Sequence, residues 1–250
     1  MRRADYAIVV GLFVLSHALY RMLGVQFDSG TLLPYMQFID PPLLRERLLE
    51  SLWYYHAHPP LLNLFTGVGL KLFGDHAGVY FAVSFHALGL ALALAVYVLT
   101  LRLTCSRAAA IVANGLLVFS PAFVLYENWL MYTLPSAALL TISALLLHQY
   151  LATRRLRWAV AFFSTLAILL LTRSMFHLAW MVLVVVLLTI LLRQHWRQVL
   201  LAAAAPLLLV LFWYAKNYYY FGTFGASTAM GLGLSNITTL MLYGDRKSVV

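Results

Sequence analysis

The sequence predicts an all-α, polytopic membrane protein: a bundle of about seven transmembrane helices with a large first outer loop that carries interfacial helices. Two observations predict this fold class. The chain of 250 residues is 63% hydrophobic and 10% charged, whereas soluble domains carry about a quarter charged residues. The apolar residues also gather in runs close to the ~20 residues that a spanning helix needs. A water-exposed surface cannot be built from this composition.

Seven apolar runs qualify as spans. The first is retained rather than cleaved as a signal peptide, because Val25-Gln26-Phe27-Asp28 follows it in place of an Ala-x-Ala-like cleavage site. The fifth is short, and we expect it to extend to Leu156 and Thr172. The runs are Tyr6–Leu23, Val79–Leu101, Ala108–Leu125, Leu130–Leu151, Trp158–Leu171, Met175–Leu192 and Val199–Tyr214.

An eighth stretch, Leu61–Phe73, decides the topology. It has thirteen residues and contains Gly67, Gly69 and Lys71. If it does not cross, every basic cluster falls on one side, which is then the cytoplasm. These clusters are Arg2/Arg3, Arg102/Arg107, Arg154/Arg155/Arg157 and Arg193/Arg197. We therefore predict an interfacial helix at Leu61–Phe73, a cytoplasmic amino terminus, and a bacterial cytoplasmic membrane whose active face is outward.

The charge balance fits this topology. The formal net charge of +9 comes from basic residues in short clusters between the apolar runs, which is how membrane orientation is encoded, and nucleic acid is not a predicted partner. Seven of the eight acidic residues lie outside in this topology, and only Asp5 lies inside. The single cysteine, Cys105, excludes an internal disulfide.

The predicted organisation is a single module over residues 1–244. Residues 25–77 form the first outer loop, and its Pro41–Tyr54 stretch has leucines at helical spacing, which predicts an amphipathic helix lying flat on the membrane. Residues 216–244 form a second outer segment, rich in Gly, Tyr, Ser and Thr. Residues 245–250 read as a translated adapter, so we predict a non-native tail on an amino-terminal fragment of a longer protein.

Two outer-face carboxylates are candidate catalytic residues. Asp28 follows the first span, and Glu127 lies on the very short connection between the third and fourth spans. A carboxylate near the bilayer surface is costly unless it is solvated, paired or used. The alternative for Asp28 is a turn residue before Gly30, and the alternative for Glu127 is a solvated loop acid.

His56 and His58 are candidate substrate-binding residues. They precede Pro59 and Pro60, which favour an extended approach followed by a helix start and so hold the two imidazoles on a fixed corner. A His-x-His pair can bind metal, but no third ligand is evident nearby. We predict hydrogen bonding to a phosphate or sugar and assign no metal ligand, while leaving a divalent metal open as a cofactor.

Three further residues at outer helix ends are candidates for binding an anion. Arg173 and Lys216 end the fifth and seventh spans, and His177 lies one turn after Arg173. Outer ends usually lack positive charge, so cations there suggest a bound anion, although snorkelling is the alternative. Three other residues are given no such role: Arg21 is interpreted as a snorkelling cation, and His17 and His86, within apolar spans, as packing residues.

An acid just after the first span, a long outer loop and the corner His58-Pro59-Pro60-Leu61 resemble GT-C glycosyltransferases. The similarity is to the protein-mannosyltransferase and aminoarabinose-transferase-like branch, and it covers nearly the whole chain. This resemblance implies inverting transfer of a sugar from a polyprenyl-phosphate donor to a hydroxyl acceptor at the non-cytoplasmic face. The acceptor could be protein, lipid or glycan.

The resemblance also implies residue roles. Asp28 would be the general base, Glu127 would help to bind or orient substrate, and Arg173 and Lys216 would neutralise the leaving lipid phosphate. Two departures are visible: Ser29 stands where many relatives have a second acid, and Glu127 stands where Asp is common. The alternatives are a transporter or flippase for a lipid-linked substrate, and a non-catalytic membrane subunit with a degenerate transferase fold.

Overall fold

The computed structural model describes residues 3–32 and 38–228, and this part of the chain is helical without a β-strand. Three short 3₁₀ turns occur at Gly30–Leu32, Gly74–His76 and Arg193–His195. The helices are α1 (Arg3–Met22), α2 (Pro41–Glu46), α3 (Leu48–Tyr54), α4 (Pro60–Phe73), α5 (Ala77–Thr104), α6 (Arg107–Val118), α7 (Pro121–Glu127), α8 (Thr133–Thr153), α9 (Leu156–Thr172), α10 (Leu178–Leu191) and α11 (Trp196–Phe221). The predicted all-α class is confirmed.

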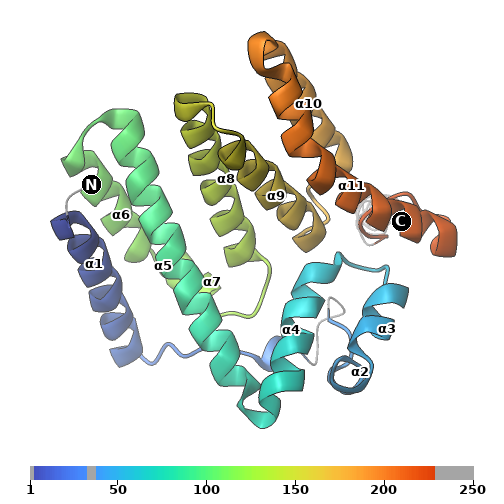
Figure 1. The fold of residues 1–250 in the computed structure, drawn as a ribbon. Helices are drawn as coiled ribbons and strands as arrows, with labels where there is room; N and C mark the ends of the chain where they lie inside the picture. The colour runs from blue at the N-terminus through green and yellow to red at the C-terminus, as the bar shows by residue number, and fades with distance from the viewer. Residues whose placement is uncertain (1–2, 33–37, 229–250) are drawn as a thin grey trace, which may run out of the picture.

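The buried side chains form two clusters. One cluster joins α1, α5, α6 and α7 with the short helices α2 to α4, and Phe81 and Phe85 of α5 lie in it. The other joins the end of α8 with α9, α10 and α11 around Phe163 and Leu170. Helix α8 packs against both α5 and α9 and so connects the two groups (Figure 1).

Large apolar side chains also cover the outside of the helices. Leu201 and Leu208 of α11 are 70% and 64% exposed, and Val79 and Val83 of α5 are 64% and 63% exposed. An outward-facing apolar surface on this scale is costly in water and is the surface that a bilayer solvates. The helices are therefore compatible with an integral membrane protein that crosses the bilayer several times.

Length and apolarity make four helices candidate membrane spans, or five if one bent pair is a single span. The four are Ala4–Met22, Pro60–Thr104, Thr133–Thr153 and Arg193–Phe221, and the bent pair is α6 with α7. Helices α9 and α10, with 17 and 14 residues, are shorter. Within the described residues, then, four to five candidate spans are present where the sequence predicts seven.

The turns between the helices lie at two ends of the bundle. The α5–α6, α8–α9 and α10–α11 turns, which carry the arginine clusters, lie at the same end of the bundle as the start of α1 (Figure 1). The connections that follow α1, α4, α7 and α9 lie toward the opposite end. The start of α1 is tied to the first of these turns by an ion pair in which Arg107 lies 2.7 Å from the buried Asp5.

The predicted span at 108–125 is not one continuous helix. Helix α6 ends at Val118, α7 begins at Pro121, and the two axes differ by 60°. Pro121 has no amide hydrogen to continue the helix, and its ring disfavours helical geometry in Ser120, which has a ψ of 126°. This bend directs the last turn of α7, with Glu127, toward α1 and α5.

The predicted amphipathic helix at 41–54 is divided into α2 and α3 by Arg47, whose φ and ψ are −127° and 46°. Leu44 and Leu48 are buried, but their methyl groups pack on Gly67 of α4, where a β-carbon would lie 2.2 Å from a Leu48 methyl carbon. Their apolar face therefore contacts protein, which corrects the expectation that it lies flat against lipid. A helix over 61–73 is confirmed as α4.

The last helix continues past the predicted end of the seventh span at Tyr214. Helix α11 runs to Phe221 and is ended by Gly222, whose φ of 67° is the left-handed conformation common at helix ends. Lys216 therefore lies inside the helix and not in the predicted outer segment. Residues 229–244 of that segment, and the predicted non-native tail at 245–250, lie outside the described residues.

Candidate functional site

The segment that carries Asp28 pairs with the chain just after α7. The Asp28 amide donates a hydrogen bond to the Asn128 carbonyl at 2.7 Å, and the Leu130 amide donates to the Asp28 carbonyl at 3.2 Å. This isolated parallel bridge fixes the backbone of Asp28 on both sides. Asp28 therefore pairs with Asn128, the residue directly after Glu127. The sequence alone could not establish this proximity.

The Asp28 carboxylate is exposed and faces a cavity of about 440 Å³. Its Oδ1 accepts a 2.7 Å hydrogen bond from the amide of Gly30, so the turn that the sequence suggests is present. Tyr126 and Trp129 form an aromatic wall of the same cavity, with their rings stacked at 6.2 Å. A carboxylate held by its own turn beside an open aromatic-lined cavity can accept a proton from a bound hydroxyl group.

Glu127 is the last residue of α7 and is completely buried, so it is not the solvated loop acid that the sequence allowed. Its Oε2 lies 2.8 Å from Nε2 of His17 on α1, and its Oε1 lies 3.4 Å from Nδ1 of His86 on α5. Gly89, one turn after His86, makes room for it: a β-carbon there would lie 2.2 Å from Glu127 Oε1. Three helices therefore converge on one carboxylate.

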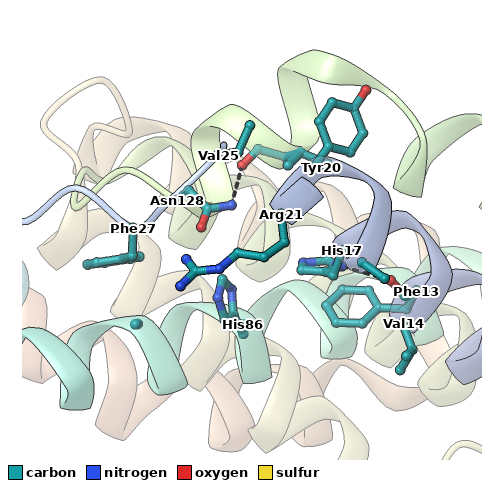
Figure 2. A pocket seen from close by; sticks show the side chains of 12 residues that line it. Phe13, Val14, His17, Tyr20, Arg21, Val25, Phe27, His86 and Asn128 are labelled. Atoms are coloured by element: carbon teal, nitrogen blue, oxygen red, sulfur yellow. Dashed lines mark hydrogen bonds between the residues drawn. The ribbon is translucent and has the colours of Figure 1, made fainter. Parts of the chain in front are cut away.

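A second cavity, of about 540 Å³, opens beside this cluster. His17, His86, Arg21 and Asn128 contribute its polar lining, and Phe13 and other apolar side chains form the rest (Figure 2). The Asp28 cavity and this one share two lining residues, Val25 and Asn128, so they are neighbours. Arg21 faces a cavity, which differs from the expectation that it only snorkels at a helix end.

No family model, curated protein or solved structure matches the chain. The chemistry of the site therefore rests on its own side chains. Arg21 and the apolar walls of its cavity are suited to an amphipathic anion, and the exposed carboxylate of Asp28 is suited to a hydroxyl group that donates to it. The buried Glu127 and the partly exposed His17 and His86 offer three atoms that could hold a metal ion.

His56 and His58 lie at a second location, near the end of α11. The His56 carbonyl accepts the Thr228 amide at 3.0 Å, its Nδ1 lies 3.2 Å from Thr228 Oγ1, and its ring lies 4.2 Å from that of Phe221. His58 is half-buried, and burial lowers the pKa of its imidazole. The chain turns at His56 and His58 as predicted. Among the described residues, His56 contacts Thr228 and Phe221.

Lys216 is buried and points into the protein. Its Nζ donates a 2.8 Å hydrogen bond to the Trp53 carbonyl at the end of α3 and lies 4.0 Å from the centre of the Trp213 ring. A carbonyl and an aromatic face together lower the cost of a buried ammonium group. This arrangement joins α3 to α11, a contact that the sequence did not predict.

Arg173 and His177 flank the turn between α9 and α10. The Arg173 guanidinium lies 4.7 Å from the centre of the Tyr132 ring. Tyr132 comes two residues after Leu130, whose amide donates to the Asp28 carbonyl. His177 caps the start of α10, where its Nδ1 accepts the Ala179 amide at 3.2 Å. It also lines a third cavity, of about 330 Å³, with Tyr214.

The predicted site residues therefore fall into separate groups. Asp28 lines one cavity, and Glu127 lies behind His17 and His86, which line the neighbouring cavity. His56 and His177 instead contact α11 or the residues that follow it, and Lys216 lies on α11 itself. The sequence analysis missed His17, His86 and Arg21. A signal was available, because ionisable side chains inside apolar spans are rare and mark functional positions by default.

Proposed function

We propose that the protein is a glycosyltransferase that moves a sugar, with inversion, from a polyprenyl-phosphate donor to a hydroxyl acceptor at the non-cytoplasmic face of the membrane. The observation that supports this most is the exposed carboxylate of Asp28, held at a cavity beside a second, mainly apolar cavity that contains Arg21. Inverting transfer needs a base on one face of the sugar and positive charge near the leaving phosphate on the other.

Asp28 is the proposed general base. Its backbone is fixed by the bridge to Asn128 and Leu130, and one of its carboxylate oxygens is fixed by Gly30. Such preorganisation keeps a base in reach of the acceptor hydroxyl without a further ordering cost. The stacked rings of Tyr126 and Trp129 offer an aromatic surface on which a sugar ring can lie.

Arg21 is the cation best placed to face the donor phosphate. It lines the cavity next to Asp28, whereas Lys216 is engaged by Trp53 and Trp213 inside the protein. The Arg173 guanidinium lies over the ring of Tyr132, which follows the segment that pairs with Asp28. The lining of the Arg21 cavity is mainly apolar, as binding of a lipid-linked phosphate requires.

The same proposal includes seven crossings with a cytoplasmic amino terminus, in which α9 and α10 cross although they are short. Helices α2 to α4 would then form the outer interface, and Asp28 would lie at the outer boundary of the bilayer. Support comes from the three arginine-bearing turns that share one end of the bundle. Positive charge in short connections is typical of the cytoplasmic side.

One observation favours a transporter or flippase as the second candidate. Glu127 is fully buried between three helices together with His17 and His86, and buried ionisable clusters between helices are typical of transport pathways. A non-catalytic subunit is the third candidate. The exposed position of Asp28 favours the enzyme, because a transport cluster does not need a carboxylate in an aromatic-lined cavity at the helix ends.

The test is transfer of radiolabel from polyprenyl-phosphate-linked mannose or aminoarabinose by the full chain in liposomes. Asp28→Asn keeps a side-chain oxygen that accepts the Gly30 amide, so the variant should fold. Because an amide cannot act as a general base, its turnover should fall at least about a hundredfold. The matched control is Asp75→Asn, because the Asp75 side chain is 97% exposed and 3.7 Å from Arg45. Turnover by Asp28→Asn equal to wild type would remove the base, and label accumulating inside vesicles without transfer would favour transport.

A further inference from the structure

The cluster of His17, His86 and Glu127 is the strongest unassigned site in the described chain. Each residue offers one ligand atom, and the three atoms lie within 4.8 Å of one another. They come from α1, α5 and α7, so the cluster exists only in the folded protein. Glu127 is fully buried, and the side chains of His17 and His86 are 21% and 38% exposed.

The hydrogen bond on the far side of His17 sets the protonation of its ring. Nδ1 lies 2.7 Å from the Phe13 carbonyl, which can only accept, so Nδ1 carries the hydrogen. In the neutral ring Nε2 therefore carries a lone pair in place of a hydrogen, and this nitrogen lies 2.8 Å from Glu127 Oε2. Two lone pairs at this distance repel each other unless positive charge lies between or on them. A histidine that donates through one nitrogen and presents the other is the usual form of a metal ligand.

The second pair of atoms points to the same conclusion. His86 Nδ1 and Glu127 Oε1 are buried, lie 3.4 Å apart, and have no hydrogen-bond partner among the described residues. Buried polar atoms are nearly always satisfied, so two that face each other need an explanation. Ligands about 2.0–2.2 Å from a tetrahedral zinc ion lie about 3.3 Å apart. This spacing is close to the 3.4 Å between His86 Nδ1 and Glu127 Oε1, whereas His17 Nε2, at 2.8 Å from Glu127 Oε2, must move slightly away from the carboxylate when an ion binds.

We propose that His17, His86 and Glu127 bind a divalent transition-metal ion of the zinc class. Two imidazoles and one carboxylate form a ligand set of zinc sites that keep an open position, whereas calcium and magnesium prefer oxygen ligands. The open position faces the 540 Å³ cavity, which His17 and His86 line together with Arg21. An anion in that cavity would meet the metal on one side and the guanidinium group of Arg21 on another.

In this proposal His17 and His86 are metal ligands, whereas the sequence suggested that they are packing residues. The site also gives Gly89 a function, because any side chain at that position would displace the Glu127 carboxylate. The aromatic rings of Phe13, 4.0 Å from the His17 ring, and of Phe27, 6.4 Å from the His86 ring, limit the rotation of both imidazoles. A site built this way holds its ligands in place before metal arrives.

The first experiment uses the wild-type full chain, purified in detergent, stripped with chelator and reloaded with zinc or cobalt. We expect about one ion per chain and X-ray absorption at the zinc edge that shows scattering from two imidazole rings. A cobalt-loaded sample should give the visible absorption of a four-coordinate ion. Absence of bound metal, or absence of imidazole scattering, would overturn the proposal without the use of any variant.

The second experiment identifies the ligands. Zinc affinity should fall by more than about tenfold in His17→Ala, His86→Ala and Glu127→Gln, since second-shell changes alone cost that much. His76→Ala is the matched control, because His76 is an exposed histidine on the turn after α4. Equal affinity in a folded ligand variant would exclude that ligand. Metal content is measured without any transfer assay, so this inference and the proposed reaction can fail separately.

Discussion

His17 Nε2 lies 2.8 Å from Glu127 Oε2, although 110 residues separate the two side chains along the chain. The contact joins the first helix to the end of the bent α7, and His86 of α5 approaches the other carboxylate oxygen. Because Asn128 and Leu130 follow at once and pair with Asp28, the position of Glu127 also determines where the exposed carboxylate lies. The buried cluster and the exposed acid therefore form one structural unit.

The two histidines should couple to Glu127 with different strength in chelator-treated protein. A double-mutant cycle between His17→Ala and Glu127→Gln should give a coupling energy of about 1–3 kcal/mol, because a buried hydrogen bond with a charged partner is lost. The cycle with His86→Ala should give less, since that pair is 3.4 Å apart. Reversible unfolding in mixed micelles measures both, and equal coupling energies would contradict the assigned geometry.

Gly89→Ala should damage the site while the equivalent change in α6 does not. A β-carbon at Gly89 would lie 2.2 Å from Glu127 Oε1, so the carboxylate must move, and we expect a loss of about 1–3 kcal/mol in the free energy of unfolding. Gly115→Ala is the matched control, because a β-carbon at Gly115 would meet nothing within 4 Å and alanine favours the helix. A thermal shift that is the same in both variants would argue against close packing at Gly89.

Replacement of Lys216 should affect stability more than substrate affinity. Lys216→Met leaves the Trp53 carbonyl without its 2.8 Å donor and removes the cation from the Trp213 ring, which we expect to cost about 1–3 kcal/mol. Lys71→Met, at an exposed lysine near the end of α4, should change little. If Lys216→Met kept the wild-type melting temperature and raised KM for the donor, Lys216 would be a substrate contact as the resemblance implies.

His58 should make stability fall at mildly acidic pH. Burial lowers the pKa of His58 in the folded protein, so the unfolded chain binds the proton more readily. The stabilising contribution is present above the ordinary histidine pKa of about 6.5 and is lost as the pH falls below that value toward the folded pKa. His58→Gln should flatten the dependence of melting temperature on pH between about 5 and 7.

The single cysteine allows one side of the membrane to be assigned in the wild-type chain. Cys105 is exposed in the α5–α6 turn, beside Arg102 and Arg107. With a cytoplasmic turn, a membrane-impermeant maleimide should label it only in permeabilised cells. In a Cys105→Ser chain, Ser29→Cys should be labelled in intact cells, because the proposed topology places Ser29 and Asp28 on the outer face. Labelling of both positions from the same side would refute the proposed topology.

Much of the helix pattern follows from the sequence. The predicted extension of the fifth apolar run to Leu156 and Thr172 coincides with the observed bounds of α9. Three of the four arginine clusters lie at or beside turns that share one end of the bundle. Local composition carries this information, because long apolar runs form helices in lipid and short charged connections end them. Pro121 could also have identified the break before it, because proline disfavours helical geometry in the residue that precedes it. The predicted span at 108–125 crosses this break.

Composition and charge pattern were enough to predict a helical, membrane-compatible chain with arginine clusters in its short connections. The folded arrangement was needed to show that Glu127 is buried against His17 and His86, that Lys216 points to Trp53, and that Arg21 faces a cavity. The reason is physical. A helix that is apolar on all sides has no periodic signal to tell which face meets a neighbour. Its rotation is set by packing with helices that can lie a hundred residues away along the chain.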